Sequence, residues 1–239
     1  MKNRSRLVAV CLLAAFGAQS AAAKEYLAER SYRNTLVKPE ERPHVSVPKR
    51  PDFFVRPAAL IGDTRDEAAR MAEMEASMRS LLEAAKADKG VELSIVRRSG
   101  QDSFAAPLAD LQTFKSIVAK GSRRDSSVAR ILVKTPVGEK DDLDAVEARL
   151  NAFLAAASMT GRTEFVFQGR AELSLLNPRR YRIDVVRAIA EDARQITEAM
   201  GDGYAVRVKG LEQELAWGRS GDLEMRLFIR HDLEIVPRH

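Results

Sequence analysis

The stretch NPRRYRIDVVRAIAEDARQITEAMGDGYAVRV, residues 177–208, decides the fold because it predicts a long amphipathic helix that leads into a strand. Asn177 is a favourable N-cap residue, and Pro178 suits the first helical position. Gly201 supplies the left-handed residue that often ends a helix, and residues 204–208 then favour a strand. The apolar side chains recur every three or four residues on one helix face: Val186, Ile189, Ala193, Ile196 and Met200, widened by Ile183 and Ala190. A stripe of this length has to be covered by a sheet or by another helix.

The first 23 residues predict a secretory signal peptide. Three basic residues precede an apolar run at positions 7–18, and Ala21, Ala22 and Ala23 form a small-residue cleavage pattern. The apolar run is too short to cross about 30 Å of hydrocarbon. The only cysteine, Cys11, lies inside this run, so the mature chain from Lys24 is expected to contain neither a disulfide nor a thiol nucleophile. These features predict an exported, periplasmic protein.

Residues 24–51 predict an extended or disordered arm, with a partner-binding peptide as the functional alternative. Four prolines lie there among many charges and little apolar periodicity: Pro39, Pro43, Pro48 and Pro51. The full chain has 39 basic and 34 acidic side chains, and removal of the three basic residues of the signal peptide leaves 36 against 34. A nearly balanced charge with few aromatic residues argues against nucleic-acid binding.

Residues 52–239 are expected to form a single domain that begins with a strand, a helix and a strand. Residues 52–61 predict the first strand, in which Pro57 suggests an edge position or a bulge. Thr64 and Glu67 form a capping box ahead of a helix over 66–87, and residues 91–96 predict the next strand. The helix stripe is interpreted as core rather than as an adaptable methionine surface; it comprises Met71, Met74, Met78, Leu81 and Ala85.

The middle of the chain gives one ambiguous segment and a second strand–helix pattern. Residues 97–125 are compatible with a short helix, a strand or a long loop over one sheet face. They include a basic cluster that faces either solvent or an anionic partner and comprises Lys120, Arg123 and Arg124. Residues 127–135 predict a strand, and Asp141 or Asp142 begins a helix that ends by Gly161. Its stripe comprises Leu143, Val146, Leu150, Phe153 and Ala157. Residues 163–176 predict two short strands, or one strand with a bulge, at Gly169.

The C-terminal residues 222–236 predict one long antiparallel strand, because apolar and polar side chains alternate. One set comprises Leu223, Met225, Leu227, Ile229, His231, Leu233 and Ile235; the other comprises Glu224, Arg226, Phe228, Arg230, Asp232 and Glu234. A hairpin through 218–221 would pair this strand with 211–217. His231 belongs to the apolar set, so its ring is expected to face inward. The order of elements predicts an α+β fold, with a mixed, largely antiparallel sheet and about three long helices packed on one face.

The assembled pattern resembles the SIMPL-domain family of bacterial envelope proteins. The resemblance rests on the signal peptide, the strand–helix–strand unit, AIAEDARQITEAMGDGYAVRV at 188–208 and the alternating terminal strand. It covers most of residues 52–236 and implies an exported protein of a family whose members mostly have no assigned activity and in part assemble into large rings. The family's glycine-rich first strand is missing, since residues 52–64 read DFFVRPAALIGDT.

No catalytic, cofactor-binding or metal-ligating residue is predicted. The three histidines, His44, His231 and His239, have no metal-ligand spacing, and no nucleophile elbow or phosphate loop occurs. Ser46 and Lys49 make an isolated S-x-x-K match in the arm. The remaining charged clusters are read as surface features: Asp141-Asp142, Glu191-Asp192, and Arg179, Arg180 and Arg182, the last with an anionic partner as the alternative.

The sequence therefore favours a protein that acts by association, with itself or with a protein partner, and without cofactors or catalysis. If the terminal strand lies at a sheet edge, its unpaired backbone groups and its charges of both signs offer a surface to another chain. Two alternatives remain: a binding protein for a lipid or small ligand between helices and sheet, and a hydrolase with an unrecognised carboxylate pair.

Overall fold

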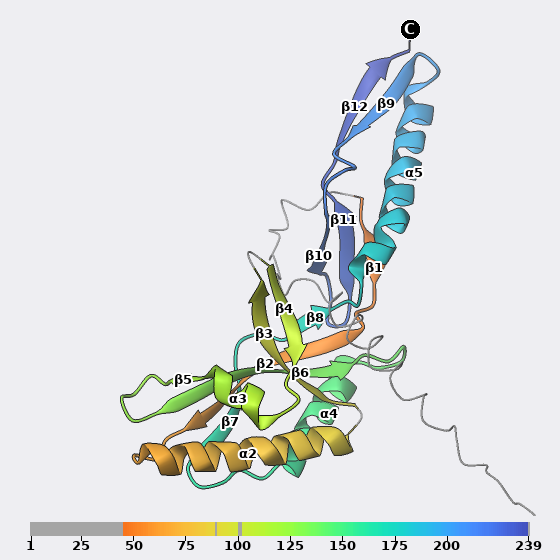
Figure 1. Cartoon of the computed structure of the whole chain (residues 1–239). Coiled ribbons are helices and arrows are strands. Elements are labelled where there is room, and N and C mark those ends of the chain that lie inside the picture. The colour runs from red at the N-terminus through yellow and green to blue at the C-terminus, as the bar shows by residue number, and fades with distance from the viewer. Residues whose placement is uncertain (1–44, 89, 100–101, 239) are drawn as a thin grey trace, which may run out of the picture.

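The computed structural model describes residues 45–88, 90–99 and 102–238, which form an elongated molecule of two lobes (Figure 1). The large lobe contains the longest sheet and three helices, and the small lobe contains one long amphipathic helix and five strands. The predicted α+β class is confirmed, and the strand pairs among the described residues are all antiparallel. The strands form three separate sheets, where a single sheet was expected.

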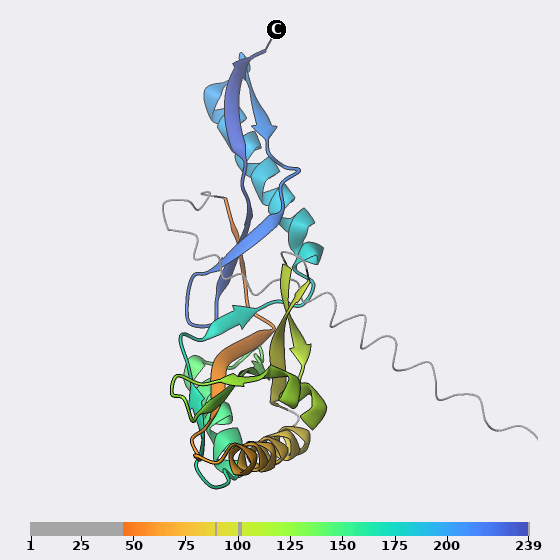
Figure 2. The same ribbon diagram turned by 60° about the vertical axis from the view of Figure 1, so that its left-hand side comes forward.

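The large lobe is built around β2 (Phe53–Gly62), which pairs with β6 (Ser127–Pro136) along its whole length. The other strands of this sheet are β3 (Glu92–Ser99), β4 (Asp102–Pro107), β5 (Val118–Lys120), β7 (Thr163–Phe167) and β8 (Glu172–Ser174). Three helices pack against one face of the sheet (Figure 2): α2 (Glu67–Ala87), α3 (Leu111–Ile117) and α4 (Leu143–Ala156). The opposite face has a small core of its own around Val55, Ala105 and Leu132.

Pro57 does not mark an edge strand, and the expectation of an edge or a bulge was wrong. On the side away from β6, β8 pairs with Phe53–Val55 and β7 pairs with Ala58–Gly62, so Pro57 lies between the two partners. Its carbonyl accepts a hydrogen bond from the backbone N–H of Gln168 at 2.8 Å. The missing N–H of proline is thus tolerated inside a central strand because the neighbouring edge changes strands there.

The N-cap of helix α2 lies two residues after the start of the expected capping box. Asp66, rather than Thr64, is the N-cap residue, and its carboxylate accepts from the N–H of Ala69 at 2.8 Å. Thr64 instead donates its hydroxyl to Glu73 at 2.6 Å. The core stripe is confirmed at Met74, Met78 and Leu81, and the sequence missed the burial of three other positions: Arg70, Ser77 and Leu82.

The ambiguous segment 97–125 contains both a helix and strands, so the loop alternative was wrong. Leu111 and Ile117 bound α3, whose N-cap Asp110 accepts from the N–H of Thr113 at 2.6 Å. Val118 begins β5, which pairs with the first residues of β6. The second strand–helix pattern is confirmed: Asp142 caps α4, which buries Val146, Leu150 and Phe153.

The small lobe is organised around α5 (Arg182–Met200), which follows the 3₁₀ turn η2 (Pro178–Tyr181). It packs against β1 (Val47–Lys49), β9 (Tyr204–Lys209) and β11 (Met225–Ile229), while β10 (Leu215–Arg219) pairs with β11 and β12 (Asp232–Pro237) pairs with β9. Asn177 is at φ 44° and makes no side-chain cap, so the predicted cap was wrong.

The buried stripe of α5 is narrower than predicted and lies one residue away at its start. Val185, Ile189 and Ala193 are buried, whereas Ile183 is 57% exposed and Met200 is 44% exposed. Val186 is only half-buried, so the line of contact with the strands runs through Val185, Ile189 and Ala193, which are four residues apart on one face of the helix. The stripe fades toward Met200 because the cover changes from a three-stranded sheet to the two strands β9 and β12.

The long terminal strand is in fact two strands, β11 and β12, that belong to different sheets. The expected hairpin is present, with Trp217 opposite Leu227 in the β10–β11 pair, but its first strand runs over Leu215–Arg219, so the turn follows Arg219 and does not occupy 218–221 as predicted. The chain leaves this sheet at Arg230 and His231, where Gly210 at φ 86° approaches closely; a Cβ at Gly210 would lie 2.9 Å from the carbonyl oxygen of Arg230. Phe228, expected on the wet face, is 1% exposed.

The described part of the predicted arm contains β1, which pairs with β11 through Val47 and Leu227. Residues 24–44 of that arm and the predicted signal peptide lie outside the described residues. Val45 is buried and joins the main core cluster, which runs without a break from the α2 side of the large sheet to α5.

Candidate functional site

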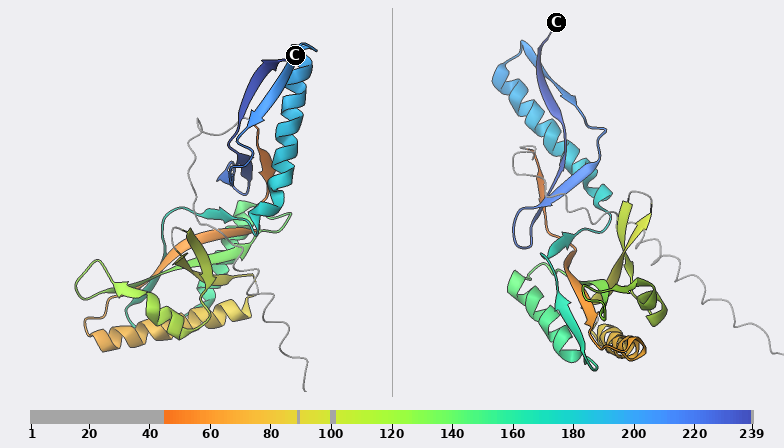
Figure 3. Two further views of the ribbon diagram at one scale, coloured as in Figure 1. Left: turned by 45° about the horizontal axis from the view of Figure 1, so that its top comes forward. Right: turned by 90° about the vertical axis from the view of Figure 1, so that its left-hand side faces the viewer.

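The outer half of the small lobe is a two-stranded ribbon, β9 and β12, with α5 beside it (Figure 3). The register places Val208 opposite Leu233 and Val206 opposite Ile235. Residues directly opposite each other point to the same face, and successive residues alternate between faces. One face of the ribbon is therefore apolar, and the other carries Arg207, Lys209, Asp232 and Glu234.

The outer edge of β12 is open, because β9 is its only strand partner in the described part of the chain. The N–H of Arg238 donates to the carbonyl of Gly203 at 2.9 Å, which continues the ladder as a hydrogen-bonded pair. Such pairs alternate with non-hydrogen-bonded pairs in an antiparallel ladder. Asp232, Glu234 and Val236 therefore direct their backbone groups to β9. The outward groups belong to Leu233, Ile235 and Pro237, of which Pro237 offers only its carbonyl.

Three large apolar side chains are exposed at this end of the molecule. Ile235 is 47% exposed, Met200 is 44% exposed and Tyr204 is 42% exposed. They come from the end of α5 and from both strands of the ribbon. Single exposed apolar residues are ordinary, but a group beside an open edge is typical of interaction surfaces.

The charged face of the ribbon has one ionic cluster and two charges outside it. Glu234 lies 2.7 Å from the Lys209 ammonium and 3.6 Å from the Arg207 guanidinium. The hydrogen bond from Lys209, its charge and that of Arg207 hold the pKa of Glu234 below its usual range. Asp232 and Arg238 are exposed, and neither has an ion pair among the residues that the structure places.

A groove of about 530 Å³ lies where the lobes meet, and it is the second feature of interest. Its lining comes from β1, the β6–α4 loop and the β10–β11 turn: Pro48, Lys49, Arg50, Asp141, Asp142, Leu143, Gly221, Asp222, Leu223 and Glu224. Arg50 bridges the groove's walls by donating to the carbonyls of Gly138, at 2.8 Å, and Asp141. The lining is strongly charged, unlike the predominantly apolar lining of lipid and drug sites.

The carboxylates at the groove have structural roles. Asp142 caps α4 through the N–H of Ala145 at 2.8 Å. Asp141 accepts from the N–H of Gly138 and from Arg149, and these bonds hold the pKa of Asp141 below its usual range. Both side chains are thus engaged in holding the β6–α4 loop, which does not support the hydrolase alternative at this pair.

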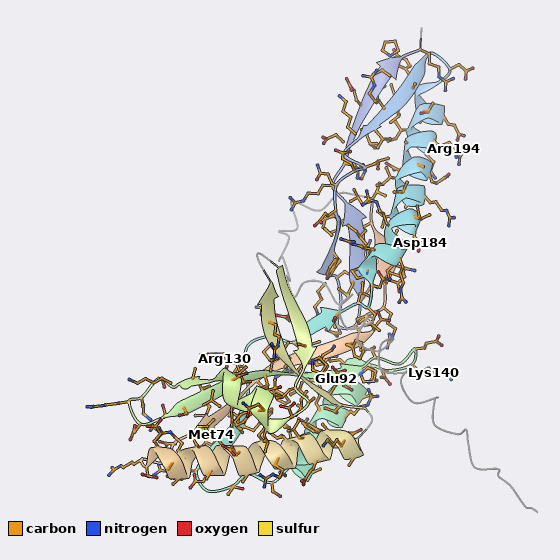
Figure 4. All side chains as sticks on the ribbon, viewed as in Figure 1. Met74, Glu92, Arg130, Lys140, Asp184 and Arg194 are labelled. Carbon is orange, nitrogen blue, oxygen red and sulfur yellow. The ribbon has the colours of Figure 1, made fainter. Side chains whose placement is uncertain are left out.

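The arginines predicted at the start of the long helix are dispersed by the 3₁₀ turn. Arg180 lies 3.5 Å from Asp52, and Arg182 donates to the carbonyls of Gln213 and Leu211. Farther along α5, Arg194 binds Glu191 and Glu198 on the exposed side, in the position visible in Figure 4. Hydrogen bonds from Arg194 and Gln195 lower the pKa of Glu191 to about 2.

The basic cluster of the middle segment is also separated. Arg123 forms an ion pair with Asp63, which raises the pKa of Arg123 and lowers that of Asp63, and Arg162 lies 3.2 Å from the same carboxylate. Lys120 and Arg124 remain exposed. No anion-binding constellation is assembled from this cluster within the described residues.

The structure does not bring the isolated candidate residues from the sequence, Ser46, Lys49 and His231, together into one site. Ser46 accepts from Arg226 at 3.4 Å, whereas Lys49 lies 3.7 Å from Asp184 and 4.7 Å from the centre of the Tyr181 ring. His231 is half-buried, and its Nδ1 lies 2.7 Å from the carbonyl oxygen of Ile229. Across the described positions there is no group of three or more histidine, cysteine or acidic side chains that could hold a metal ion.

Sequence reasoning missed a buried lysine and the exposed group at the tip. Lys134 is 1% exposed on the helix-free face of the large sheet, with its ammonium 4.5 Å from the Phe53 ring centre and 3.9 Å from Glu92. Its position in the otherwise apolar strand RILVKT was the available signal. The exposure of Met200 and Tyr204 had no signal, since periodicity does not tell where the cover of a helix ends.

None of the helices that the structure describes is both long enough and apolar enough to span a membrane. Comparisons of the chain with protein-family models, with characterised proteins and with solved structures gave no match.

Proposed function

We propose that this protein is exported to the periplasm and acts there by association, through the open edge of β12, rather than by catalysis. The observation that carries the proposal is the outward-directed backbone of Leu233 and Ile235 on a terminal strand whose only described neighbour is β9. A further strand added there would satisfy these groups and extend a ribbon that two strands alone stabilise poorly. The exposed apolar side chains beside the edge support the same reading.

The edge carries features that restrict which chain can be added. β12 is short, it ends in Pro237, and its charged face has both signs. Such features are the usual protection of edge strands against unselective pairing. An edge that is both open and protected in this way suits a specific partner better than general aggregation.

A proline substitution at the edge tests the proposal. Ile235→Pro removes an N–H that points outward and leaves the hydrogen bonds to β9 in place, so the fold is retained while association is lost. Light scattering on the mature chain from Lys24, over a range of concentrations, measures the association. Ile235→Val is the matched control, because it keeps the N–H and should behave as the unchanged protein.

The proposal fails if the mature protein is a monomer at every concentration and no partner is recovered by crosslinking in the envelope. Export is tested separately by N-terminal sequencing of protein from the envelope fraction. A mature chain that begins at Lys24 supports the cleavage after Ala23, and a chain that still begins at Met1 contradicts it. The resemblance to the SIMPL-domain family supports both export and association. We therefore also propose that the chain is a member of that family.

The groove between the lobes favours a second candidate function, the binding of a small polar ligand. Its volume falls within the usual range of ligand sites, of about 300–1,000 Å³, although its lining is charged. A small charged molecule fits this lining better than the lipid considered from the sequence. Native mass spectrometry of the purified protein would reveal a retained ligand, and its loss in Leu143→Arg would assign the ligand to the groove.

A further inference from the structure

We infer that the partner of β12 is the β12 strand of a second copy of this chain, paired antiparallel about a two-fold axis at Ile235. This inference rests on the proposed function and names the partner and the register for that same edge. It follows from the backbone directions of β12, from two charges at its ends that have no ion pair among the described residues, and from the exposed apolar side chain at its centre.

The backbone directions limit the possible registers. The outward groups of Leu233, Ile235 and Pro237 must face outward groups of the second copy. With the axis at Ile235, the two Ile235 residues exchange both hydrogen bonds. Each Leu233 N–H then donates to the carbonyl of Pro237 in the second copy. Because proline has no N–H, the carbonyl of Leu233 receives no hydrogen bond in return, but the rest of the ladder is unaffected.

The neighbouring registers are less favourable. An axis at Glu234 places two Glu234 carboxylates directly opposite each other, and an axis at Leu233 places Asp232 opposite Glu234 twice. Like charges in directly opposed cross-strand positions are destabilising. An axis at Val236 brings no like charges together, but it places Ile235 opposite Pro237 and loses the pair in which both residues donate and accept.

The charges at the two ends of β12 match the register centred on Ile235. Asp232 and Arg238 lie on the same face of the ribbon, equally far from Ile235 in opposite directions along the chain. The two-fold axis places Asp232 of each copy opposite Arg238 of the other, which gives two equivalent contacts. Both side chains are exposed and lack an ion pair in the described part of each copy, so both are available for these contacts.

The apolar face is completed in the same arrangement. A two-fold axis perpendicular to the ribbon keeps the apolar faces of both copies on one side, because opposed residues share a face. The two Ile235 side chains then meet at the centre of a four-stranded sheet, β9–β12–β12–β9, and cover surface that is 47% exposed in one copy. One α5 flanks each outer strand of this sheet.

Single cysteines test the register, since the only natural cysteine lies in the predicted signal peptide. Opposed residues of a hydrogen-bonded pair have Cα atoms about 5.5 Å apart, within the range that a disulfide spans. In the mature protein with oxidised glutathione, Ile235→Cys is expected to give a disulfide-linked dimer on non-reducing gels. Glu234→Cys faces Val236 in this register, so it is expected to form no disulfide and to migrate as a monomer on the same gel. A disulfide-linked dimer of Glu234→Cys and not of Ile235→Cys overturns the proposed register.

A charge exchange tests the energetics by analytical ultracentrifugation. Asp232→Lys and Arg238→Glu each place like charges opposite each other at both symmetry-related contacts. Each change should lower the affinity of the dimer roughly tenfold. The double variant restores the opposite charges and should recover most of the affinity. Glu212→Lys and Arg179→Glu, exposed positions outside β12, make the same charge changes and should leave it unaltered.

The outcomes separate this inference from the proposed function. A double variant no stronger than the weaker single variant overturns the two-fold register. If the protein self-associates and Ile235→Pro abolishes the association while neither charge variant affects it, the edge functions but in a different pairing. If the protein is monomeric at every concentration and crosslinking recovers no partner, both proposals are overturned.

Discussion

At the scale of single residues, the small lobe depends on a few side chains of α5 that face its strands. Ile189 is fully buried in the main core cluster, while Glu191, two positions later, is exposed and held by Arg194. Ile189→Asp is expected to unfold the protein, because an unpaired buried carboxylate costs several kcal/mol and a whole domain is stable by about 5–15 kcal/mol. Glu191→Ala should leave the melting temperature nearly unchanged. Equal melting temperatures, measured by circular dichroism, would show that the faces of α5 are wrongly assigned.

Arg70 is a residue-scale feature of the large lobe with a purely structural role. It is 6% exposed, and its guanidinium donates to Ser127 and to the carbonyls of Thr64, Arg65 and Asp125. Arg70→Met keeps the apolar stem but leaves these carbonyls without a donor. We expect a loss of about 2–4 kcal/mol in the free energy of unfolding.

The matched control for this change is Arg79→Met, on the same helix at an exposed position. Urea denaturation of the two variants measures the difference. A shift for Arg79→Met as large as that for Arg70→Met would contradict the assignment, since the effect would then reflect a general loss of positive charge from α2.

At the scale of elements, the start of α2 distinguishes the observed cap from the predicted capping box. Asp66 accepts from the N–H of Ala69, whereas no side-chain hydrogen bond of Glu67 is seen among the described residues. Asp66→Ala is expected to cost about 1 kcal/mol in stability, as for other N-cap replacements. Glu67→Ala should cost less than half of this in urea denaturation, and the reverse order would favour the capping box.

The elements that the sequence predicted well are those whose pattern is local. The strand over 127–135 and the stripe of Val146, Leu150 and Phe153 were confirmed because their burial follows directly from periodicity. The break between β11 and β12 was not predictable in this way. The alternation continues through Arg230 and His231, so only the separate partners of the two strands, β10 and β9, reveal it.

The candidate site was predictable in part for the same reason. The alternation of charges and apolar residues on the terminal strand identified it as a candidate edge, and the charged positions Asp232 and Glu234 are exposed as expected. The direction of each backbone group required the register with β9. The small-lobe sheets as such could not be foreseen, since strand order depends on contacts between residues far apart in the chain.

At the scale of the whole molecule, the two lobes are joined where the chain passes between them twice. The first passage leads from β1 to β2 and the second from β8 to η2, and Asp52 links them. Its N–H donates to the carbonyl of Ser174 at 2.9 Å, its carbonyl accepts from Val137 at 3.0 Å, and its carboxylate accepts from the N–H of Leu176 at 2.7 Å. Arg50, which donates to Gly138, and Arg219, which donates to the carbonyl of Ala171, add bridges on either side.

Asp52→Ala should therefore loosen the second passage without unfolding either lobe. The change removes the acceptor of the Leu176 N–H and the partner of Arg180, while the backbone hydrogen bonds of Asp52 remain. Trypsin cleaves after arginine, and Arg179 and Arg180 lie in η2 directly after this passage. We expect limited trypsin digestion of Asp52→Ala to cleave there several times faster, because local opening exposes the backbone. Asp52→Asn retains an acceptor oxygen and should be intermediate, and Asp202→Ala, at an exposed position after α5 and away from the junction of the lobes, should digest like the unchanged protein. Cleavage in η2 at one common rate in all four proteins would show that Asp52 does not hold the lobes together.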